Sequence, residues 1–586
     1  MQQSPCDAAT EPKASRLYAF VGGTAVLLFV IALTGLPNLM DNERRISAYV
    51  LDAVHNGHWM AQRDSMGEVM SKPPMVTWIA ALTTLALDRP TRFAIYLPSA
   101  LATVLVALLL LRIGREQFGW TAGLFGALAY VLSPIGYEMV QSARYDGLFA
   151  LPVALAAFAA FHAWKSGRGW TWFWLAAAFA TLVKGPLGVV LGAGGLLAGL
   201  WEWRSGARQP LRGQHWLGLA LYVVVCAGWF WLAYREMGQP LIDKLIKGEL
   251  VRHAVQGNEG EGMGVKFWEP PFSFLKLLLP WSLASILAFW RVVWRPSPDP
   301  ETRRFERFLF CWFAVGLVIF SAAAHQRSRL VLPIMPPAAL LAGREIARLL
   351  AKWKPHWQSQ TIVRVTAGFA AVVLAYVVVH RHFLLRYKDA VQRTLAVREF
   401  AREIQASPGA QFPLTYVDGP FALQFYLNTM RTQVQTDRAA ELLKGSVAAF
   451  VVVGDAEKYQ RIREQVGTNG PLHELRSISA GKSKRPFWLI SNHPRLEWTE
   501  RTASLSGSFR VETHDARPVR TRGGEMLFER LSARGSMTLS NESGEPQKVR
   551  LRITGHGPDL IERRSLEPGE SWQSRVAENS SSERQP

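Results

Sequence analysis

Long apolar runs fill the first two thirds of the chain and stop near residue 386. A helix needs roughly 20 apolar residues to cross a bilayer, and runs of about that length recur here. The candidate spans are 17–36, 93–111, 120–137, 147–164, 170–183, 185–201, 216–234, 272–290, 308–323, 330–350 and 362–380. The shorter segment 73–87 fits an interfacial or re-entrant helix. The pattern predicts an α-helical polytopic membrane domain over residues 17–386, with about eleven transmembrane helices.

Basic residues are concentrated in every second predicted loop, and this pattern indicates which side of the membrane each loop lies on. If residues 1–16 are cytoplasmic, the short inner loops carry dense positive charge, as at Arg112, Arg204 and Arg344, which the positive-inside rule favours. Merging 170–201 into one helix would invert every later loop and bury Lys184 in the membrane, at a cost of several kcal/mol. We therefore expect a break at Gly185-Pro186, with the C-terminal region on the outer side.

The C-terminal third has a different pattern. Residues 387–494 alternate helical stretches with short β-rich runs such as Ala448–Val453, which predicts a soluble α/β region. Residues 495–576 alternate as short strands with Gly and Pro turns, which predicts a β-rich region. Residues 577–586 are polar and are expected to be disordered. Gly454-Asp455 follows an apolar run but lacks the glycine fingerprint of a nucleotide loop.

Composition agrees with a membrane protein. Hydrophobic residues make up 49% of the 586 residues and charged residues 19%, below the globular average of about 25%. Lys and Arg number 66 against 46 for Asp and Glu, and because much of this excess flanks spans, topology explains it better than nucleic-acid binding. Cys6, Cys226 and Cys311 are scattered, so no disulfide framework is indicated.

Charged residues of separate loops are expected to converge on the outer surface. The outer loops are 37–92, 138–146, 235–271 and 324–329, and the first contains an acidic cluster followed by Lys72-Pro73-Pro74. The charged residues predicted on this side are Asp41, Glu43, Lys72, Arg144, Asp146, Lys184, Glu249, Arg252, His325, Arg327 and Arg329. Such a set fits a site, while solvated linkers flanking the spans are the alternative.

Sugar transfer from a lipid phosphate is a reaction that needs these groups. Arg and Lys stabilise the departing phosphate, a carboxylate serves as general base for the acceptor hydroxyl, and no nucleotide site is required. Asp41 or Glu43 is the candidate base or acceptor-orienting group, with helix capping as the alternative. Asp146 stands at the mouth of a span, where a salt bridge to Arg144 is the alternative. Lys72, Lys184, Arg252 and Arg329 are candidate phosphate ligands, unless they are snorkelling interfacial cations.

Metal binding is less well supported by the sequence. His325 fits an interfacial histidine better than a ligand, and no spacing supports a tight zinc site. A weakly bound divalent cation near the carboxylates remains an alternative as a cofactor.

Several short motifs occur along the chain in the same order as in one known family. They are Asn42-Glu43 with Arg45 and Gly57-His58-Trp59, Ser71-Lys72-Pro73-Pro74 with Trp78, Leu97-Pro98-Ser99-Ala100, Arg144-Tyr145-Asp146, Lys184-Gly185-Pro186, Glu249-Leu250 with Arg252, Pro280-Trp281-Ser282, and Gln326 through Arg329 to Leu332-Pro333. Over residues 17–350 the chain resembles the lipid-phosphate-dependent glycosyltransferases of the C superfamily (GT-C), in the branch of aminoarabinose transferases and protein O-mannosyltransferase-like proteins (family 39-like).

The resemblance implies a multi-pass protein of the bacterial inner membrane. It implies an inverting enzyme that moves a sugar from a polyprenyl-phosphate donor to an envelope acceptor such as lipid A or another glycolipid, on the periplasmic side. It also implies that Asp41, Glu43 and Asp146 are catalytic, and that Lys72, Arg144, Lys184, Glu249, Arg252 and Arg329 bind the substrate. The sequence departs from the family at two positions, where Asn42 and Ser71 replace acidic residues. Glu68 could take the role of the acidic residue that is missing at position 71.

Three alternatives to a glycolipid-directed enzyme remain at this point. A protein hydroxyl could be the acceptor instead of a glycolipid. A transporter or flippase for lipid-linked sugars would place ionisable residues near the midplane of the membrane, whereas here they gather at one rim. A pseudoenzyme or assembly scaffold is kept open by the altered acidic motifs.

Overall fold

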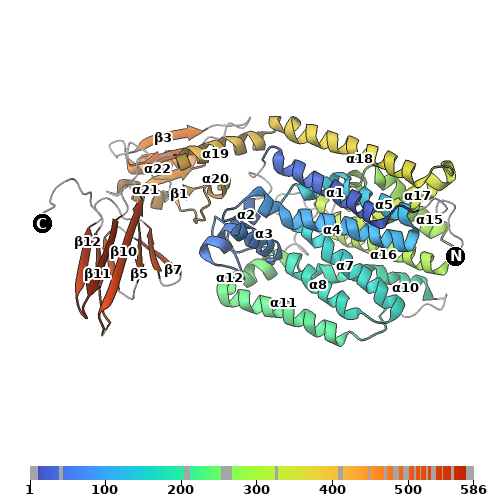
Figure 1. The fold of residues 1–586 in the computed structure, drawn as a ribbon, viewed down its shortest axis with the longest axis horizontal. Coiled ribbons are helices and arrows are strands. Elements are labelled where there is room, and N and C mark those ends of the chain that lie inside the picture. The colour runs from blue at the N-terminus through green and yellow to red at the C-terminus, as the bar shows by residue number, and fades with distance from the viewer. Residues whose placement is uncertain are drawn as a thin grey trace. The chain divides into compact units, whose positions relative to one another are not determined.

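A computed structural model describes most of the membrane region and separate segments of the C-terminal third. The described residues are 11–37, 44–203, 211–251, 267–323, 327–406, 414–445, 449–467, 472–478, 487–492, 501–506, 510–514, 517–522, 525–529, 536–543, 545–555 and 560–575. The chain forms two compact units, residues 1–394 with 428–430, and residues 395–427 with 431–586. The first unit is helical, and the second contains the β-sheets (Figure 1).

The first unit is a bundle of long apolar helices. Within the described residues, seven segments are long and apolar enough to cross a membrane. They are α1 (Ala14–Thr34), α4 (Arg92–Phe118), α7 (Tyr145–Ser166), α11 (Trp216–Met237), α16 (Pro300–Ala322), η6 with α17 (Ser328–Ile334, Met335–Trp353) and α18 with η7 (Ser359–His382, Leu384–Tyr387). The multi-pass helical membrane fold predicted from the sequence is therefore confirmed.

Two further candidate spans are broken helices. The pair α5 (Trp120–Val131) and α6 (Pro134–Val140) bends by 63°, and α14 (Glu269–Leu277) with α15 (Trp281–Trp294) bends by 119°. If each pair is one span, the described part of the chain has nine. The difference from about eleven lies in α8 (Trp170–Lys184) and the run Leu187–Trp201 (α9, η3 and α10), which are shorter than the 18 residues required of a span.

The predicted break at Gly185-Pro186 separates these two helices. α8 ends at Lys184, and Gly185 has φ +95°, a left-handed conformation that glycine adopts without strain. Pro186 then caps the next helix, α9 (Leu187–Ala193). Treating 170–201 as two helices was therefore correct, and Lys184 lies at a helix end.

Glycines allow the central helices to approach closely. A Cβ on Gly123 of α5 would lie 2.6 Å from the carbonyl oxygen of Leu111 in α4. A Cβ on Gly343 of α17 would lie 2.3 Å from the backbone nitrogen of Gly126 in α5. Small residues at membrane helix interfaces permit this backbone packing, so α5 is held tightly between α4 and α17.

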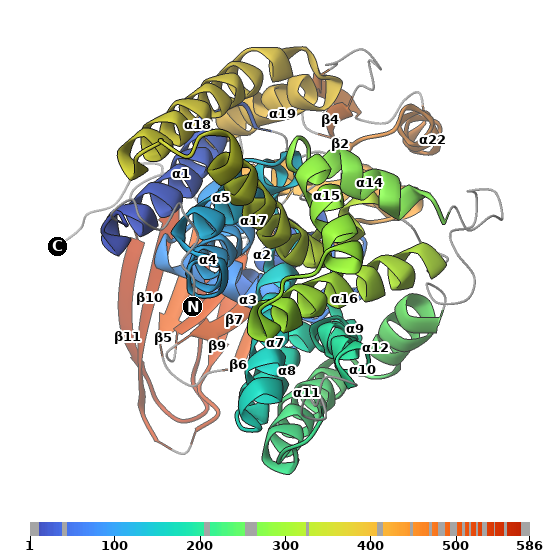
Figure 2. The same ribbon diagram turned by 90° about the vertical axis from the view of Figure 1, so that its right-hand side faces the viewer.

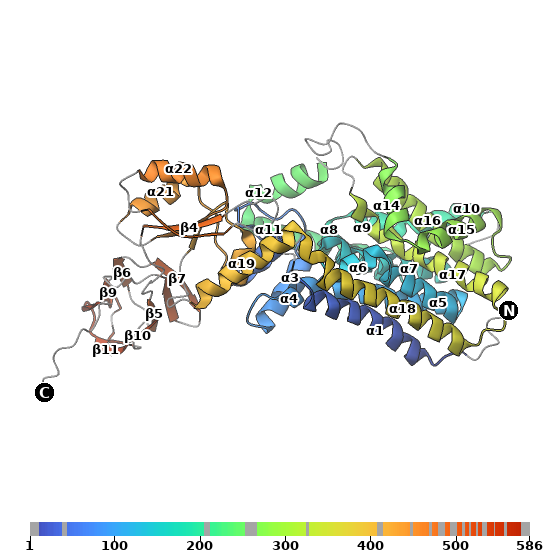
Figure 3. The ribbon, with the colours of Figure 1, turned by 90° about the horizontal axis from the view of Figure 1, so that it is seen from above.

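Short helices gather at one end of the bundle, which we call the loop end. They are α2 (Arg44–Leu51), η2 (Asp52–Asn56), α3 (Met75–Ala86), α12 (Gln239–Ile242) and η5 (Asp243–Val251). They lie away from the N-terminus (Figure 1), and α1 and α18 run side by side along one flank (Figures 2 and 3). The predicted interfacial segment 73–87 corresponds to α3.

Buried ion pairs join the helices at the opposite end, where α10 (Ala198–Trp201) lies (Figure 1). Glu202 accepts from Arg307 at 2.6 Å and lies 3.4 Å from Arg303. The carboxylate of Glu345 lies 3.1 Å from Arg291, and Glu306 pairs with Arg344. All three glutamates are at most 1% exposed, so each is shielded from solvent and compensated by arginine.

The second unit begins with a small mixed sheet. Its strand order is β1-β2-β4-β3, with β1 (Leu414–Val417) parallel to β2 (Phe450–Val453), and β4 (Phe487–Ser491) antiparallel to β2 and β3 (His473–Ile478). Helices α21 (Thr436–Lys444) and α22 (Ala456–Val466) bury their apolar faces in the same core as β2. Helix α20 (Phe421–Tyr426) and the part of α19 (Asp389–Ala406) from Leu395 on belong to the same unit.

The remaining strands form two antiparallel sheets. One has the order β11-β10-β5-β8-β7 and the other β12-β9-β6. The strands are β5 (Arg501–Ser506), β6 (Arg510–His514), β7 (Arg517–Arg522), β8 (Glu525–Glu529), β9 (Ser536–Ser540), β10 (Gln547–Gly555), β11 (Leu560–Leu566) and β12 (Ser571–Arg575). The described residues thus contain small β-sheets after the helical membrane region, whereas the domain limits at 387, 495 and 577 remain predictions.

Candidate active site

Asp146 and Lys184 form an ion pair between two helix ends. Asp146 lies in the first turn of α7, and Lys184 is the last residue of α8. The two side chains are 16% and 15% exposed, and the ammonium lies 5.8 Å from the centre of the Phe149 ring. Because water screens this pair poorly, its charges act more strongly than those of a surface pair.

The partner of Asp146 differs from the one considered in the sequence analysis. A salt bridge to Arg144 was the alternative there, whereas the structure pairs Asp146 with Lys184, 38 residues away. Arg144 instead lies near Glu138, with 3.9 Å between its Nε and Oε1 of the carboxylate. The same Glu138 oxygen contacts Nε of Arg329. The structure therefore brings four predicted site residues, Arg144, Asp146, Lys184 and Arg329, into two ion-pair groups.

The start of α7 is fixed against α4. Ser99 Oγ donates to the carbonyl oxygen of Arg144 at 2.8 Å, and the backbone N–H of Arg144 lies 3.3 Å from the same hydroxyl. A Cβ on Gly147 would come within 2.7 Å of the Ser99 side chain, so the two helices are in close contact. This contact sets the position of both Arg144 and Asp146.

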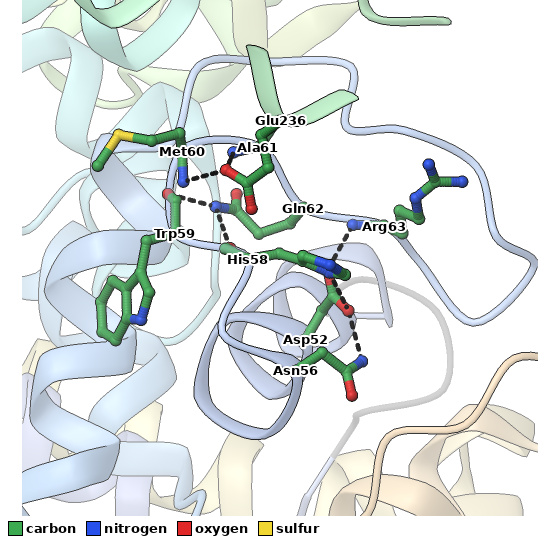
Figure 4. Close-up of polar contacts among 9 residues, drawn as sticks. All are labelled: Asp52, Asn56, His58, Trp59, Met60, Ala61, Gln62, Arg63 and Glu236. Carbon is green, nitrogen blue, oxygen red and sulfur yellow. Dashed lines mark hydrogen bonds and ion pairs between the residues drawn. The ribbon is translucent and has the colours of Figure 1, made fainter. Parts of the chain in front are cut away.

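Asp52 organises the first loop (Figure 4). Its carboxylate, which is 2% exposed, accepts from Asn56 Nδ2 and the Arg63 backbone N–H, both at 2.7 Å. It also contacts His58 Nδ1 at 3.1 Å. Gln62 donates to the carbonyl oxygens of His58 and Trp59. A buried carboxylate with several donors fixes the local backbone, so residues 52–63 form an ordered turn.

Helix α11 holds the same loop. The Glu236 carboxylate accepts from the backbone N–H groups of Met60 and Ala61 at 3.1 and 3.3 Å (Figure 4). Trp229 Nε1 donates to the Met60 carbonyl oxygen at 3.1 Å. Leu182, two residues before Lys184, packs in one apolar cluster with Ala61 and the end of α11. The loop therefore lies beside the end of α8 that carries Lys184.

Glu68, which could replace the family's acidic residue at Ser71, pairs with Lys244 in the structure. It lies in a turn closed by the Asp64 N–H to Glu68 C=O bond of 2.9 Å, and it accepts from Lys244 Nζ at 2.7 Å. The hydrogen bond from Lys244, followed by the charge of that ammonium, lowers the pKa of Glu68. Glu68 thus ties the turn to η5, while Ser71 is buried nearby.

Of the other predicted site residues, two lie within the described part of the chain. Lys72 is half-buried just before α3, and Glu249 lies in η5. Asp41, Glu43, Arg252 and His325 fall outside the described residues. No group of three metal-ligating side chains occurs among the described residues. The proposed roles of all these residues, and of a divalent cation, remain predictions.

Sequence reasoning missed Glu138, Asp52 and Glu236. Glu138 follows the predicted span 120–137 directly and precedes Arg144 by six residues, so its place at the membrane edge was a usable signal. Asp52 and Glu236 gave no comparable signal, because the backbone N–H groups that they accept from, those of Arg63 for Asp52 and of Met60 and Ala61 for Glu236, cannot be identified from residue type.

Comparison with known proteins supports the predicted resemblance. Residues 71–231 match the family model described as dolichyl-phosphate-mannose-protein mannosyltransferase. An undecaprenyl phosphate-alpha-4-amino-4-deoxy-L-arabinose arabinosyl transferase of Pseudomonas fluorescens is 23% identical over 391 residues, 63% of each chain. The corresponding transferase of Pseudomonas paraeruginosa is 25% identical over 349 residues, 55% of this chain and 58% of that protein. The chain thus spans less than two thirds of these two relatives.

The crystal structure of ArnT from Cupriavidus metallidurans bound to undecaprenyl phosphate has a similar fold. The TM-score is 0.64 at 16% identity, and the match covers 83% of this chain and 99% of ArnT. Together with the sequence relatives, this fold shows a multi-pass membrane protein that is similar to aminoarabinose transferases and to the dolichyl-phosphate-mannose-protein mannosyltransferase family.

Proposed function

We propose that this protein is an inverting glycosyltransferase that moves a sugar from a polyprenyl phosphate to lipid A or another envelope glycolipid. The reaction would take place on the periplasmic side of the bacterial inner membrane, with the N-terminus in the cytoplasm. The observation that carries the proposal is the presence of two ion-pair groups at the ends of membrane helices, Asp146 with Lys184, and Glu138 with Arg144 and Arg329. The donor class is further supported by the relative named for an undecaprenyl phosphate sugar and by the similar structure bound to undecaprenyl phosphate.

In this mechanism the acceptor hydroxyl attacks the anomeric carbon of the sugar. A carboxylate accepts the hydroxyl proton, the new glycosidic C–O bond forms, and the bond to the lipid phosphate oxygen breaks. The electron pair of that bond leaves with the polyprenyl phosphate, whose added charge is stabilised by cationic side chains. Asp41 or Glu43 is proposed as the base, and Asp146 as a second catalytic carboxylate.

Lys184 and the arginines fit the role of phosphate ligands. Lys184 is held at the end of α8 by Asp146, and partial burial strengthens its field. Arg144 and Arg329 present planar guanidinium groups that match phosphate oxygens. Lys72, Glu249 and Arg252 are proposed to complete substrate binding from the neighbouring loops.

Incubation of the purified protein with radiolabelled polyprenyl-phosphate sugars tests the proposal. Separate reactions would contain lipid A, whole envelope glycolipids, or a Ser- and Thr-containing peptide as acceptor. Label in a glycolipid supports the proposed class, and label in the peptide supports the protein O-mannosyltransferase-like alternative. Movement of the lipid-linked sugar across proteoliposomes without transfer would support the flippase alternative and overturn an enzymatic function.

A further inference from the structure

Glu138 contacts two guanidinium groups from different elements. It lies on α6, whereas Arg144 caps α7 and Arg329 lies in η6, 191 residues further along the chain. The side chains of Glu138, Arg144 and Arg329 are 24%, 17% and 35% exposed. Glu138 therefore lies between two residues that the sequence analysis assigned to the substrate site.

The break between α5 and α6 places Glu138 there. The Gly136 N–H donates to Ser133 Oγ at 3.2 Å, and Pro134 occupies the first turn of α6, an arrangement that starts a new helix. A Cβ on Gly136 would lie 2.1 Å from the Tyr130 carbonyl oxygen, so this turn is tightly packed. The Glu138 backbone is held further by Ser142, whose hydroxyl donates to its carbonyl oxygen at 2.7 Å.

Two guanidinium groups at such a place need a counter-charge. Arginine stays protonated in proteins, so the two side chains repel each other unless an anion lies between them. One carboxylate oxygen of Glu138 accepts a hydrogen bond from Nε of Arg329 and lies 3.9 Å from Nε of Arg144, within ion-pair distance. Each guanidinium has five N–H donors, so an arginine whose Nε faces Glu138 can bind a second anion through its other N–H groups at the same time.

We propose that Glu138 is a positioning residue, which holds Arg144 and Arg329 in the orientation that binds the phosphate of a polyprenyl phosphate. This inference rests on the proposed function and assigns the residue no proton transfer. The phosphate oxygens accept from the terminal N–H groups, while Glu138 keeps the two arginines from separating or turning away. Preorganised donors lose less free energy to reorganisation when the anion binds and when the leaving phosphate gains charge.

A double-mutant cycle tests whether Glu138 acts through the arginines. Glu138→Gln, Arg329→Gln and the double variant are compared for sugar transfer and for binding of sugar-free polyprenyl phosphate in detergent. We expect Glu138→Gln to weaken lipid-phosphate binding about tenfold and to raise the KM for the donor, as loss of a charged hydrogen bond does. In the Arg329→Gln background the same change should have less than about a threefold effect, because coupled residues are non-additive.

Conservative variants separate positioning from folding. Glu138→Asp should recover part of the lost binding, because it keeps the charge. Glu116→Gln is the matched control, since Glu116 pairs with Arg112 on an exposed surface and should leave binding unchanged. Tighter lipid-phosphate binding in Glu138→Gln would mean that the carboxylate only competes with the ligand, which overturns the inference. Equal effects of Glu138→Gln with and without Arg329 would overturn it as well.

The same measurements distinguish the proposed function of the protein from the proposed role of Glu138. If the unchanged protein neither transfers sugar nor binds polyprenyl phosphate, the proposed function fails. If the unchanged protein does both and Glu138→Gln behaves like it, only the role of Glu138 fails.

Discussion

Lys184, the last residue of α8, contacts the carboxylate of Asp146 in the first turn of α7. The two charges come from different helices and meet where both helices end. Gly185 lets the chain turn immediately after Lys184, so the ammonium remains at the loop end of the bundle. Replacing either residue of this pair is therefore the most direct test of the candidate site.

We expect Asp146→Asn and Lys184→Ala to reduce sugar transfer by about 100-fold or more, as loss of groups that stabilise developing charge does. Radiolabel transfer from a polyprenyl-phosphate sugar measures this effect. Removing one partner also leaves a shielded charge unpaired, so thermal unfolding must be recorded in parallel. Normal folding with retained transfer in both variants would remove this pair from the active site.

Replacing Asp52 should loosen the first loop. Asn keeps one acceptor oxygen but turns an NH2 group toward donors such as the Arg63 N–H, which leaves buried donors unsatisfied. We expect a loss of about 1–3 kcal/mol in the free energy of unfolding for Asp52→Asn. Hydrogen exchange should increase over residues 52–63. Asp88→Asn is the control, because Asp88 is exposed, and unchanged exchange in both variants would contradict the role of Asp52.

Gly123→Ala should separate α5 from α4. The added methyl group would lie 2.6 Å from the Leu111 carbonyl oxygen and 2.7 Å from the Arg115 nitrogen, and these are backbone atoms. We expect a loss of about 1–3 kcal/mol in stability, measured as a lower unfolding temperature in detergent. Gly23→Ala is the matched control, because a Cβ there meets nothing within 4 Å, and it should be neutral or slightly stabilising.

The contact between Glu68 and Lys244 should weaken in acid. Since Lys244 lowers the pKa of Glu68 below its ordinary value of 4.5, the stabilisation is present above that value. It is lost as the pH falls through the lower folded-state pKa. The effect on stability is small because Glu68 is 54% exposed. Carboxyl NMR should show the Glu68 titration moving up toward 4.5 in Lys244→Met, and an unchanged titration would argue against the contact.

Much of the fold could be predicted from the sequence because hydrophobicity and glycine report on local structure. The apolar runs identified the helical membrane region, and Lys184-Gly185-Pro186 identified the end of one helix. The bends at Ser133 and before Trp281 were not predicted, because hydropathy records how apolar a segment is and not its direction.

The candidate site could be predicted only as a set of charges. Topology put Arg144, Asp146, Lys184 and Arg329 on one side, and the structure divides them into two groups. That division depends on Glu138 and on helix packing between segments far apart in the chain, which a single sequence does not contain. The assignment of Asp41, Glu43 and Arg252 stays a prediction.

The buried glutamates at the end opposite the loops restrict how this sequence can change over time. A substitution of Arg291, Arg344 or Arg307 alone would leave Glu345, Glu306 or Glu202 as a carboxylate shielded from water with reduced compensation. Neutral drift should therefore replace both members of a pair together, or neither. In an alignment of related chains, these positions are expected to covary between helices.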